Sequence, residues 1–523
     1  MMRAIVIVLV LLLSIVLIYG FINKMNAAVS LSSSCLLMST ASIMMVNKRA
    51  RITAIIPPSG SGYCKYSPFI VKPTQENVDW VEAINHIGNK LQHEGSDEPL
   101  NVLTSNQIDE INNLQTDVLM LIGLDDHPDK FKALIENGVK AVAVFNCSQE
   151  LYSIERYGEY VPNINNICEK VIEAWDNFVK NDRGQHRKMY DISQELWSRS
   201  SGDDWRFMWL MLIDSFTDFS IKSVKSVTST ENTQFSQFNC MMSNCKDELI
   251  NCFKDPVCRA ALDCLNKCRG NDQVCSYRCI TSHETPAFEK FALCILQRNN
   301  CMNNTATMPT YPDPQPMTTF RNTPLTHEIA EQIFIGHLRP REGEEARNLC
   351  PTDNEDWSWK VVCGQNPAYD YFSCQHQIFY YDAKRNSSMW YDPVFKVTTL
   401  DGVDVWRRRH YKVRRGKIPG QFYFSVLDNG VTSNEFWRIV DCADDMSWAV
   451  FYYCGCAAAA GTSYSGSLLV TKDGNWPENT DNKFSRIYNA FSTFDIKPWE
   501  LFEVSNIDCD ANCKAGKAPL SYK

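Results

Sequence analysis

The chain has 523 residues, of which 44% are apolar and 22% are charged, and its formal net charge is -9. This length predicts two or three domains, and the apolar fraction excludes a wholly disordered chain. The acidic balance, without a long basic tract, argues against nucleic acid as a partner. Ten of the 22 cysteines fall between Cys240 and Cys301, so we expect one disulfide-rich segment.

The first 75 residues have the composition of a targeting sequence. Residues 4–22 are mainly Ile, Val and Leu behind Arg3, which is typical of a signal peptide or, alternatively, of an uncleaved membrane anchor. A Ser- and Thr-rich stretch follows at residues 30–42, and the first acidic residue of the chain is Glu76. We interpret residues 1–75 as a signal and plastid-transit region, with plain secretion as the alternative.

Residues 76–225 alternate helical and strand-like patterns. Helices are expected over residues 78–92 and 130–137, and apolar strand-like runs occupy residues 117–124 and 139–145. This order predicts βαβ units around a small parallel sheet. No motif of recognisable chemistry lies in this segment, so its role stays open.

The cysteine spacing within residues 238–302 predicts a helical domain held by disulfides. Two pairs are spaced i,i+4, which places both sulfurs of a pair on one face of a helical turn: Cys264 with Cys268, and Cys275 with Cys279. If these two turns face each other in antiparallel orientation, Cys264 pairs with Cys279 and Cys268 pairs with Cys275. The i,i+7 spacing and elimination predict three further bridges: Cys245–Cys252, Cys294–Cys301 and Cys240–Cys258. The segment has no CxxC motif, so we expect disulfides rather than a metal, and an oxidising compartment.

The part of the chain from residue 350 to residue 515 is rich in β-branched and aromatic residues. Its runs are separated by Gly- and Asn-containing turns, which predicts seven or eight antiparallel strands that close into a barrel. A barrel of about eight strands holds one small ligand. The expected strands are residues 375–381, 395–400, 403–413, 421–427, 435–440, 448–453 and 467–471.

Three segments together resemble the violaxanthin de-epoxidase family. They are the cysteine block beginning Cys240-Met-Met-Ser-Asn-Cys245, the linker Tyr311-Pro-Asp-Pro-Gln-Pro316, and the segment Gly364-Gln-Asn-Pro-Ala-Tyr-Asp370. The resemblance runs from Cys240 to Cys509, about half of the chain, and the long preceding domain matches a related, less understood branch best. It implies an α+β multidomain chain with an N-terminal α/β domain, a disulfide-rich helical domain and a lipocalin-like antiparallel β-barrel. It also implies a C-terminal clasp in which Cys374 pairs with Cys509.

The resemblance implies an enzyme of the thylakoid lumen that uses ascorbate to reduce a xanthophyll epoxide. The implied catalytic residues are Glu435, Tyr453 and Asp370, with no metal. Glu435 stands where the family carries an Asp ahead of a barrel Trp, and a carboxyl in an aromatic pocket keeps its proton because the charged form is poorly solvated. The expected substrate-binding residues are Gln375, Trp437, Tyr452 and Trp359.

Departures from the family pattern keep a second function open. The family's acid-sensing histidines are replaced by Gln377 and Tyr380, and His376 points to the other face of its strand. The alternative is a non-catalytic lipocalin that binds a carotenoid or another apolar lipid. The expected partners are a carotenoid and a thylakoid galactolipid surface, with a homodimer as a further alternative. The expected location is the chloroplast, in the thylakoid lumen or on its membrane.

Two further features are left with alternatives. The basic run at residues 407–415 is expected to be a solvated hairpin face, or alternatively to bind anionic thylakoid lipid. Cys454 and Cys456 are additional to the family pattern, and a disulfide is favoured over a reactive thiol. The sequence does not fix the pairing of six cysteines: Cys350, Cys363, Cys442, Cys454, Cys456 and Cys513.

Overall fold

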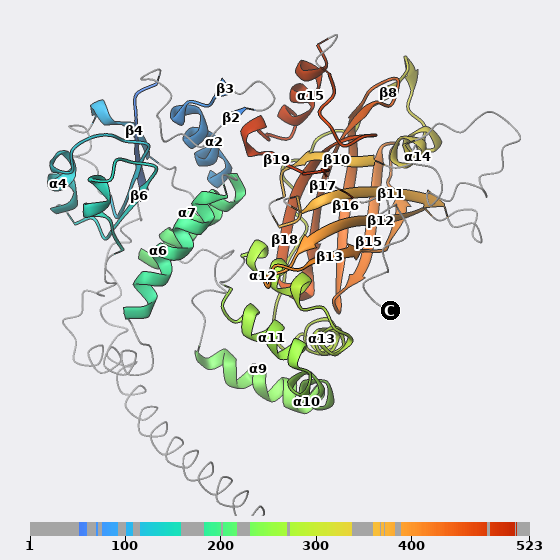
Figure 1. Cartoon of the computed structure of the whole chain (residues 1–523), viewed down its shortest axis with the longest axis horizontal. Helices are drawn as coiled ribbons and strands as arrows, with labels where there is room; N and C mark the ends of the chain where they lie inside the picture. Colours follow the sequence, from blue (N-terminus) through green and yellow to red (C-terminus); the bar gives the residue numbers. More distant parts are fainter. Residues whose placement is uncertain are drawn as a thin grey trace, which may run out of the picture.

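Figure 1 shows the computed structural model of the chain. It describes residues 52–59, 70–71, 76–92, 101–107, 116–136, 138–157, 183–199, 202–216, 231–268, 272–336, 359–366, 368–370, 372–381, 389–478, 482–507 and 509. The apolar run at residues 4–22 lies outside this part. None of the helices within the described ranges combines the length and the apolarity needed to cross a lipid bilayer.

The N-terminal part is an α/β domain, coloured blue to green in Figure 1. Its strands are β1 (Ile52–Ile56), β2 (Ile70–Val71), β3 (Glu76–Asn77), β4 (Asn101–Thr104), β5 (Val118–Ile122), β6 (Ala141–Phe145) and β7 (Arg156–Tyr157). The main sheet has the order β4-β1-β5-β6-β7, with β1, β4, β5 and β6 parallel and β7 antiparallel to β6, while β2 and β3 form a separate hairpin. The predicted parallel sheet is therefore confirmed.

The position of β1 differs from the predicted domain boundary. This strand lies inside the segment 1–75 that was interpreted as a targeting sequence, yet it pairs with both β4 and β5 in the middle of the sheet. All five of its residues are buried. The folded domain therefore includes Ile52–Ile56, and cleavage of a targeting sequence at residue 75 would remove an inner strand of the sheet.

Helices cover both faces of this sheet. They are α2 (Trp80–Gln92), α4 (Asp129–Glu136), α6 (Arg183–Ser198) and α7 (Gly202–Phe216), with short 3-10 turns η1 (Ser105–Gln107) and η2 (Leu151–Ile154). Helices α2, α6 and α7 form one core with the sheet, and α4 packs on the opposite face. The rings of Trp197 and Trp205 stack 3.8 Å apart in the first core.

The disulfide-rich segment forms a compact set of helices below the barrel in Figure 1. We call them the Cys-rich helices: α9 (Glu231–Asn244), α10 (Lys246–Lys254), α11 (Pro256–Leu265), α12 (Gln273–Ser282), α13 (Pro286–Ala292) and η3 (Leu293–Arg298). Asp255 and Thr285 cap α11 and α13, and each of these helices begins with Pro. All ten cysteines of this segment are in disulfides.

Half of the predicted cysteine pairing is wrong. The structure has Cys264–Cys279, Cys268–Cys275 and Cys374–Cys509 as predicted, but Cys240–Cys258, Cys245–Cys252 and Cys294–Cys301 are replaced by Cys240–Cys301, Cys245–Cys294 and Cys252–Cys258. Cys245 is the residue that caps the N-terminus of α10, and Cys252 lies about two turns further along this continuous helix. Two turns rise about 10 Å, farther than one disulfide spans. These cysteines therefore pair with neighbouring segments.

The C-terminal half is an antiparallel barrel. Its strands are β10 (Trp359–Gly364), β11 (Ser373–Tyr381), β12 (Met389–Thr398), β13 (Asp404–Arg408), β14 (Tyr411–Arg415), β15 (Gln421–Asp428), β16 (Val431–Cys442), β17 (Trp448–Ala457), β18 (Thr462–Thr471) and β19 (Phe502–Glu503). The order β11-β10-β18-β17-β16-β15-β14-β12 closes through the pairing of β11 with β12. The predicted lipocalin-like barrel is therefore confirmed.

One end of the barrel is plugged by helix α14 (His327–Ile335). The ring of Phe334 lies 4.7 Å from the rings of Phe379 and Phe422 and 4.9 Å from Phe451, inside the barrel. The opposite end faces the Cys-rich helices. Remaining elements outside the barrel are β8 (Thr319–Phe320), β9 (Thr323–Pro324), η6 (Ala458–Ala460), α15 (Lys483–Ser492) and η7 (Pro498–Glu500).

The segment after the barrel docks into the α/β domain. Glu500 is 1% exposed, and its carboxylate accepts hydrogen bonds from His86 (2.7 Å) and Lys90 (2.8 Å) of α2. Trp499 packs against Trp205 at 6.0 Å. Burial by itself raises the pKa of Glu500, but the charge of Lys90 and the hydrogen bond with His86 outweigh it and lower the pKa to about 2.

We expect Glu500→Gln to destabilise the protein by about 3 to 5 kcal/mol, because it removes the negative charge from the buried ion pair with Lys90. Chemical denaturation measures the free energy of unfolding. Since the pKa of Glu500 lies below the ordinary 4.5, the stabilisation is complete above about pH 4.5 and is lost as the pH falls through about 2. The matched control is Asp126→Asn, which removes an exposed ion pair with Lys130 and should cost less than about 1 kcal/mol. Equal effects of the two substitutions would contradict this account.

Candidate functional site

The open end of the barrel and the Cys-rich helices enclose a cavity of about 370 Å3. Most of its surface is aromatic and aliphatic, with a few polar groups, which is the usual make-up of a small-molecule site. The barrel contributes Asn366, Tyr369, Tyr391, Tyr411, Ser433, Glu435, Trp437, Tyr453 and Tyr464. The Cys-rich helices contribute Leu265, Gln273, Ser276, Tyr277, Ile280 and Phe288.

Glu435 is the carboxyl group at the cavity wall. It lies on β16, is 6% exposed, and accepts hydrogen bonds from the indole of Trp437 (2.6 Å) and the hydroxyl of Tyr464 (2.8 Å). The hydroxyl of Tyr411 also donates to it. Burial raises the pKa of Glu435 and these three hydrogen bonds offset part of the rise, so the carboxyl holds its proton above the ordinary range. This state suits a general acid.

Tyr453 lies beside Glu435 on the same wall. Its ring stacks on Trp437 at 4.8 Å, and Gly466 on β18 leaves room for it, since a Cβ there would lie 2.4 Å from the Tyr453 hydroxyl oxygen. Burial raises the pKa of Tyr453 well above its usual value. The phenol is therefore neutral and can both donate and accept a hydrogen bond.

Asp370 lies behind the cavity wall. It is fully buried, its Oδ2 accepts a hydrogen bond from the backbone N–H of Asn366 at 2.6 Å, and its Oδ1 has no hydrogen-bond partner among the described residues. Burial raises the pKa of Asp370 well above its usual value. The structure therefore brings Asp370 close to the cavity without placing it among the lining side chains.

Trp437 lines the cavity, but the structure does not bring the other three expected substrate-binding residues there. Gln375 is fully buried and donates to the carbonyls of Tyr369 and Phe372, so it holds the loop between β10 and β11. Tyr452 faces out of the barrel, where its hydroxyl donates to the Pro312 carbonyl at 3.0 Å. Trp359 lies at the plugged end and donates to the Ile333 carbonyl at 2.8 Å.

Several site residues were missed by the sequence interpretation. Tyr464 contacts Glu435 directly, yet the predicted final strand began at residue 467, whereas β18 begins at Thr462. Strand alternation from Leu468 back to Tyr464 is the signal that would have found it. Tyr411 and Tyr277 also line the cavity, and Tyr277 comes from a different domain, which strand alternation does not reach.

Ion pairs fasten the Cys-rich helices over the cavity. Arg409 is 1% exposed, and its guanidinium contacts both Glu284, from the turn between α12 and α13, and Asp428 (2.9 Å) of β15. Arg407 adds an ion pair with Glu284 at 2.7 Å. Four members of the basic run therefore form ion pairs with acidic side chains: Arg407 and Arg409 as above, Arg408 with Asp392, and Arg415 with Glu331.

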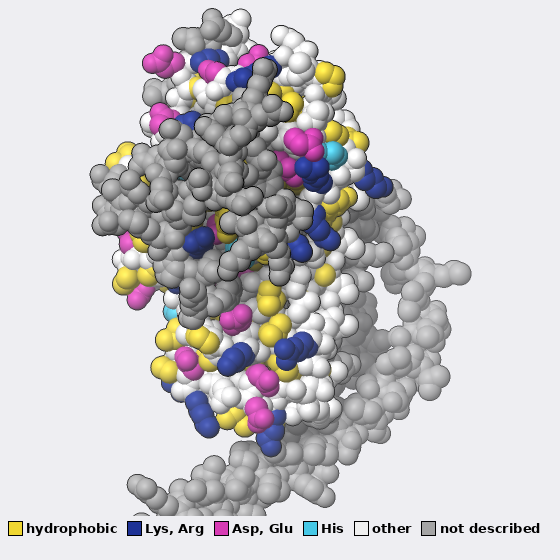
Figure 2. Space-filling view, turned by 90° about the vertical axis from the view of Figure 1, so that its right-hand side faces the viewer, with side chains coloured by type: hydrophobic (Ala, Val, Ile, Leu, Met, Phe, Trp, Pro, Cys, Tyr) yellow, Lys and Arg dark blue, Asp and Glu magenta, His cyan; other side chains and the backbone are white. Residues whose placement is uncertain are grey.

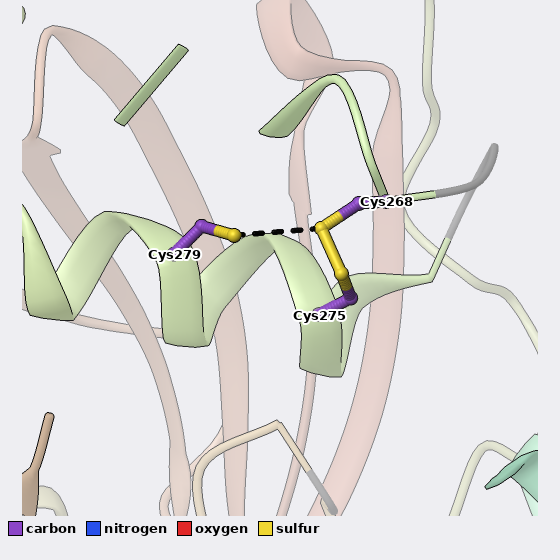
Figure 3. A group of neighbouring side chains, drawn as sticks. All are labelled: Cys268, Cys275 and Cys279. Carbon is purple, nitrogen blue, oxygen red and sulfur yellow. Dashed lines mark hydrogen bonds between the residues drawn. A yellow bond between two sulfur atoms is a disulfide. The ribbon is translucent and has the colours of Figure 1, made fainter. Parts of the chain in front are cut away.

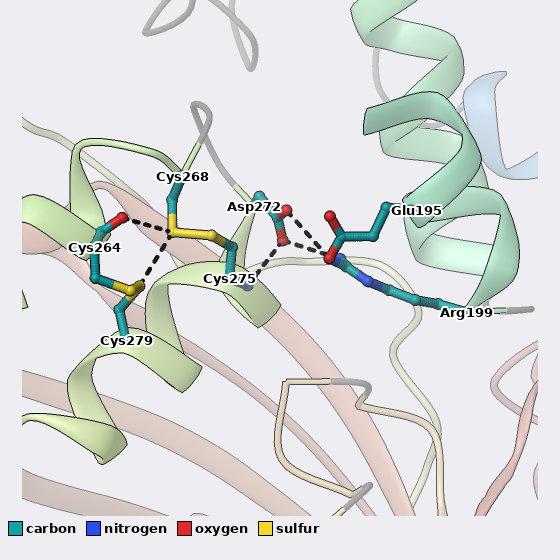
Figure 4. Close-up of a disulfide and its surroundings, with 7 residues drawn as sticks. All are labelled: Glu195, Arg199, Cys264, Cys268, Asp272, Cys275 and Cys279. Carbon is teal, nitrogen blue, oxygen red and sulfur yellow. Dashed lines mark hydrogen bonds and ion pairs between the residues drawn. A yellow bond between two sulfur atoms is a disulfide. The ribbon is translucent and has the colours of Figure 1, made fainter. Parts of the chain in front are cut away.

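Within the described residues, the cysteine sulfurs of Cys268, Cys275 and Cys279 form the single group with metal-ligand proximity. Figure 3 shows that the Cys268–Cys275 bridge lies beside Cys279, which itself pairs with Cys264. These sulfurs are therefore disulfide-bonded and are not thiolate ligands. Figure 4 shows Arg199, the residue that follows α6, beside Asp272, the residue that caps α12 next to these bridges. The guanidinium of Arg199 lies 3.0 Å from the carboxylate of Asp272.

The disulfide favoured for Cys454 and Cys456 is wrong. Both are free, as are Cys363 and Cys442, while Cys350 and Cys513 lie outside the described residues. Cys454 and Cys456 are two residues apart on β17, so their Cα atoms are separated by about 6.5 Å along an extended strand and their side chains run parallel. That geometry does not favour a bridge between them.

The two positions that replace the family's histidines lie on opposite sides of the barrel wall. Gln377 faces inward and accepts a hydrogen bond from Tyr391. Tyr380 faces outward and donates to Asp392 at 3.0 Å, and its hydroxyl lies 3.3 Å from Nδ1 of His410. His376 of β11 lies on the same outer face, and His410, between β13 and β14, is the imidazole that contacts Tyr380.

One family model and several curated proteins match this chain. A family model described as the VDE lipocalin domain matches residues 237–506. The chain is 25% identical over 269 residues to "Violaxanthin de-epoxidase, chloroplastic" of Nicotiana tabacum, covering 48% of this chain and 49% of that protein. For the protein of the same name from Arabidopsis thaliana, the values are 23% over 265 residues, 49% and 51%. The chain spans about half the length of the curated relatives it matches.

Solved structures with a similar fold include two animal proteins. Insecticyanin from the tobacco hornworm Manduca sexta is 13% identical with a TM-score of 0.25, covering 40% of this chain and 92% of that chain. Lobster apocrustacyanin A1 is 14% identical with a TM-score of 0.22, covering 31% of this chain and 83% of that chain.

Proposed function

The chain belongs to the family of VDE lipocalin domains, and we propose that its barrel removes the epoxide oxygen of a xanthophyll with ascorbate as the reductant. The observation that carries this proposal is the buried carboxyl of Glu435 at the wall of an aromatic cavity, where burial raises its pKa. An epoxide opens when its oxygen receives a proton as the C–O bonds break. The cavity supplies that proton donor where an apolar ring can bind.

The neighbouring side chains have matching roles in this proposal. Trp437 and Tyr411 hold the carboxyl of Glu435 in one orientation by their hydrogen bonds, which is the positioning that proton transfer to a bound oxygen requires. Tyr453 offers a neutral hydroxyl on the same wall. The amide of Asn366 and the hydroxyl of Ser433 also line the cavity and suit the hydroxyl groups of ascorbate. The aromatic rings provide the apolar surface for the carotenoid end group.

A non-catalytic carotenoid-binding lipocalin is the second candidate. The observation that favours it is the placement of Gln377 and Tyr380, which occupy the family's histidine positions without an imidazole. The same cavity would then hold the apolar end group, and Glu435 would anchor a hydroxyl or epoxide oxygen by a hydrogen bond. Both functions need the cavity, and only the first needs turnover.

The test incubates the full chain, with its disulfides intact, with violaxanthin, ascorbate and a thylakoid galactolipid at acidic and neutral pH. Chromatography follows the loss of the epoxide oxygen. The enzyme proposal expects a de-epoxidised product that forms only when ascorbate is present. Carotenoid that stays bound to the protein, unchanged after prolonged incubation with ascorbate, would contradict it and support the binding function.

We also propose a thylakoid membrane surface in the chloroplast as the place of action, and a homodimer as one assembly for long carotenoids. The names of the curated relatives carry the word chloroplastic, which supports the location.

In Figure 2, hydrophobic side chains lie among Lys, Arg, Asp and Glu on the lower part of the face, where the Cys-rich helices lie. Exposed Ile250, Phe253 and Val257 belong to these helices. An assay arm without galactolipid tests the lipid requirement.

A further inference from the structure

We propose that Tyr464 and Ser433 form a proton path that returns a proton from solvent to Glu435 after each turnover. The hydroxyl of Tyr464 lies 2.8 Å from Oε1 of Glu435 and 2.5 Å from Oγ of Ser433. The three groups therefore form one continuous chain of hydrogen bonds. This inference rests on the proposed function, because a proton must be consumed at Glu435 before it needs replacing.

The strand register explains how the chain is built. Ser433 and Glu435 are two residues apart on β16, so both side chains face the cavity. Gly455 on β17 pairs with Glu435 on one side and with Tyr464 on the other. A Cβ at Gly455 would lie 2.7 Å from the ring of Tyr464 and 2.9 Å from Cγ of Glu435. Because Gly455 has no side chain, the ring of Tyr464 can extend over β17 and reach the carboxyl of Glu435.

The path leads outward from the buried acid. Glu435 is 6% exposed, whereas Ser433 is half-buried near the start of β16, where the barrel meets the Cys-rich helices. The neighbouring Thr432 donates its backbone N–H to Gln297 of η3 at 2.7 Å, which places this strand end at the domain contact. Hydroxyl groups can donate and accept at once, so a proton can pass through them. The indole of Trp437 only donates, so it holds Glu435 without relaying a proton.

The balance of the proposed reaction calls for such a path. Reduction of an epoxide to an alkene and water takes two electrons and two protons. The ascorbate monoanion gives two electrons and one proton on becoming dehydroascorbate, so the second proton comes from solvent. Glu435 gives its proton to the epoxide oxygen as the C–O bonds break. Its carboxylate then takes the hydroxyl proton of Tyr464, and Tyr464 takes that of Ser433. Ser433 takes a proton from a hydronium ion of the solvent, which leaves water.

The direct test is proton exchange at Glu435, which requires no turnover. Infrared spectroscopy follows the carbonyl band of the protonated carboxyl after a jump into D2O, with Glu435→Gln used to assign the band. We expect Tyr464→Phe, which keeps the ring over Gly455, and Ser433→Ala each to slow the exchange by about tenfold or more, the usual worth of one hydrogen bond to a charged group. The double variant should be no slower than the slower single variant, because both remove the same path.

Matched controls and activity readouts complete the test. Tyr423→Phe removes a tyrosine hydroxyl from the exposed face of β15 and should leave the exchange unchanged. In the de-epoxidation assay, Tyr464→Phe should lower kcat about tenfold with KM nearly constant. Loss of the Tyr464 hydrogen bond also raises the pKa of Glu435, so the falling limb of the pH profile should move upward.

The outcomes of the exchange experiment distinguish failure of the proton path from failure of the proposed de-epoxidase function. Slow exchange in both variants supports the path, even if the wild-type chain converts no epoxide and the proposed function fails. Unchanged exchange in Tyr464→Phe and Ser433→Ala overturns the path, even if the wild-type chain is an active de-epoxidase. A fall in kcat that is matched by an equal loss of carotenoid binding would also overturn it, because that pattern belongs to a structural hydroxyl.

Discussion

Replacing Glu435 with Gln should lower de-epoxidation by about 10²-fold or more, the usual worth of a general acid. The amide keeps the size of the side chain, and its oxygen can still accept from one of the two donors, Trp437 or Tyr464, but it has no acidic proton. Carotenoid affinity should therefore change little. Because a general acid acts only when protonated, wild-type turnover should fall as the pH rises through the pKa of Glu435. Burial places that pKa above the ordinary 4.5.

The control for Glu435→Gln is Glu155→Gln. Glu155 lies in the α/β domain, and burial raises its pKa as well, so the substitution removes a comparable carboxyl far from the barrel. Turnover should stay within about twofold of the wild-type value, since Glu155 touches no group of the cavity. Equal losses of carotenoid binding and turnover in Glu435→Gln would mean that the carboxylate holds the barrel together rather than supplying a proton.

Removing the Cys374–Cys509 bridge should cost more stability than removing any short bridge of the Cys-rich helices. It closes a loop of 135 residues, for which chain entropy gives about 5 kcal/mol, whereas the Cys252–Cys258 bridge closes a loop of 6 and gives about 2 kcal/mol. The double substitutions C374A/C509A and C252A/C258A compare the two by chemical denaturation. The long bridge should show the larger loss of unfolding free energy.

The rank order of the two losses of unfolding free energy tests whether loop entropy governs the stability that these bridges provide. The long bridge ties β11 to the chain segment that follows η7, and Glu500 of η7 is itself docked in the α/β domain. Its removal should therefore also expose the Glu500 contact to proteolysis. If C252A/C258A proves the more damaging pair, loop entropy does not govern these bridges, and local packing of the helices would be the stronger influence.

Local sequence patterns predicted most of the fold because each pattern is set by neighbouring residues. The apolar runs at β5 and β6 and the alternating runs at β15 and β17 appear as predicted, with ends shifted by a few residues. Two i,i+4 cysteine pairs faced each other as expected. The failed bridges depended on which helices pack side by side, and that information is not local.

The site was predicted in part for the same reason. Glu435, Trp437 and Tyr453 lie at positions whose alternation along β16 and β17 places them inside the barrel. Tyr452 and Tyr453 are adjacent, so only one of them can face inward, and Tyr452 faces out. The basic run could not be interpreted from its own residues, because its partners Glu284 and Asp392 come from other segments.

The central claim is that Glu435 is protonated in the folded barrel, and infrared difference spectroscopy measures this most directly. The difference between the wild-type chain and Glu435→Gln isolates the carboxyl band, which is then followed as the pH is raised. We predict a protonated carboxyl band that persists above the ordinary carboxyl pKa of 4.5 and disappears only at higher pH. A band that disappears at or below pH 4.5 would show an ionised carboxylate under working conditions, and Glu435 would not be the proton donor.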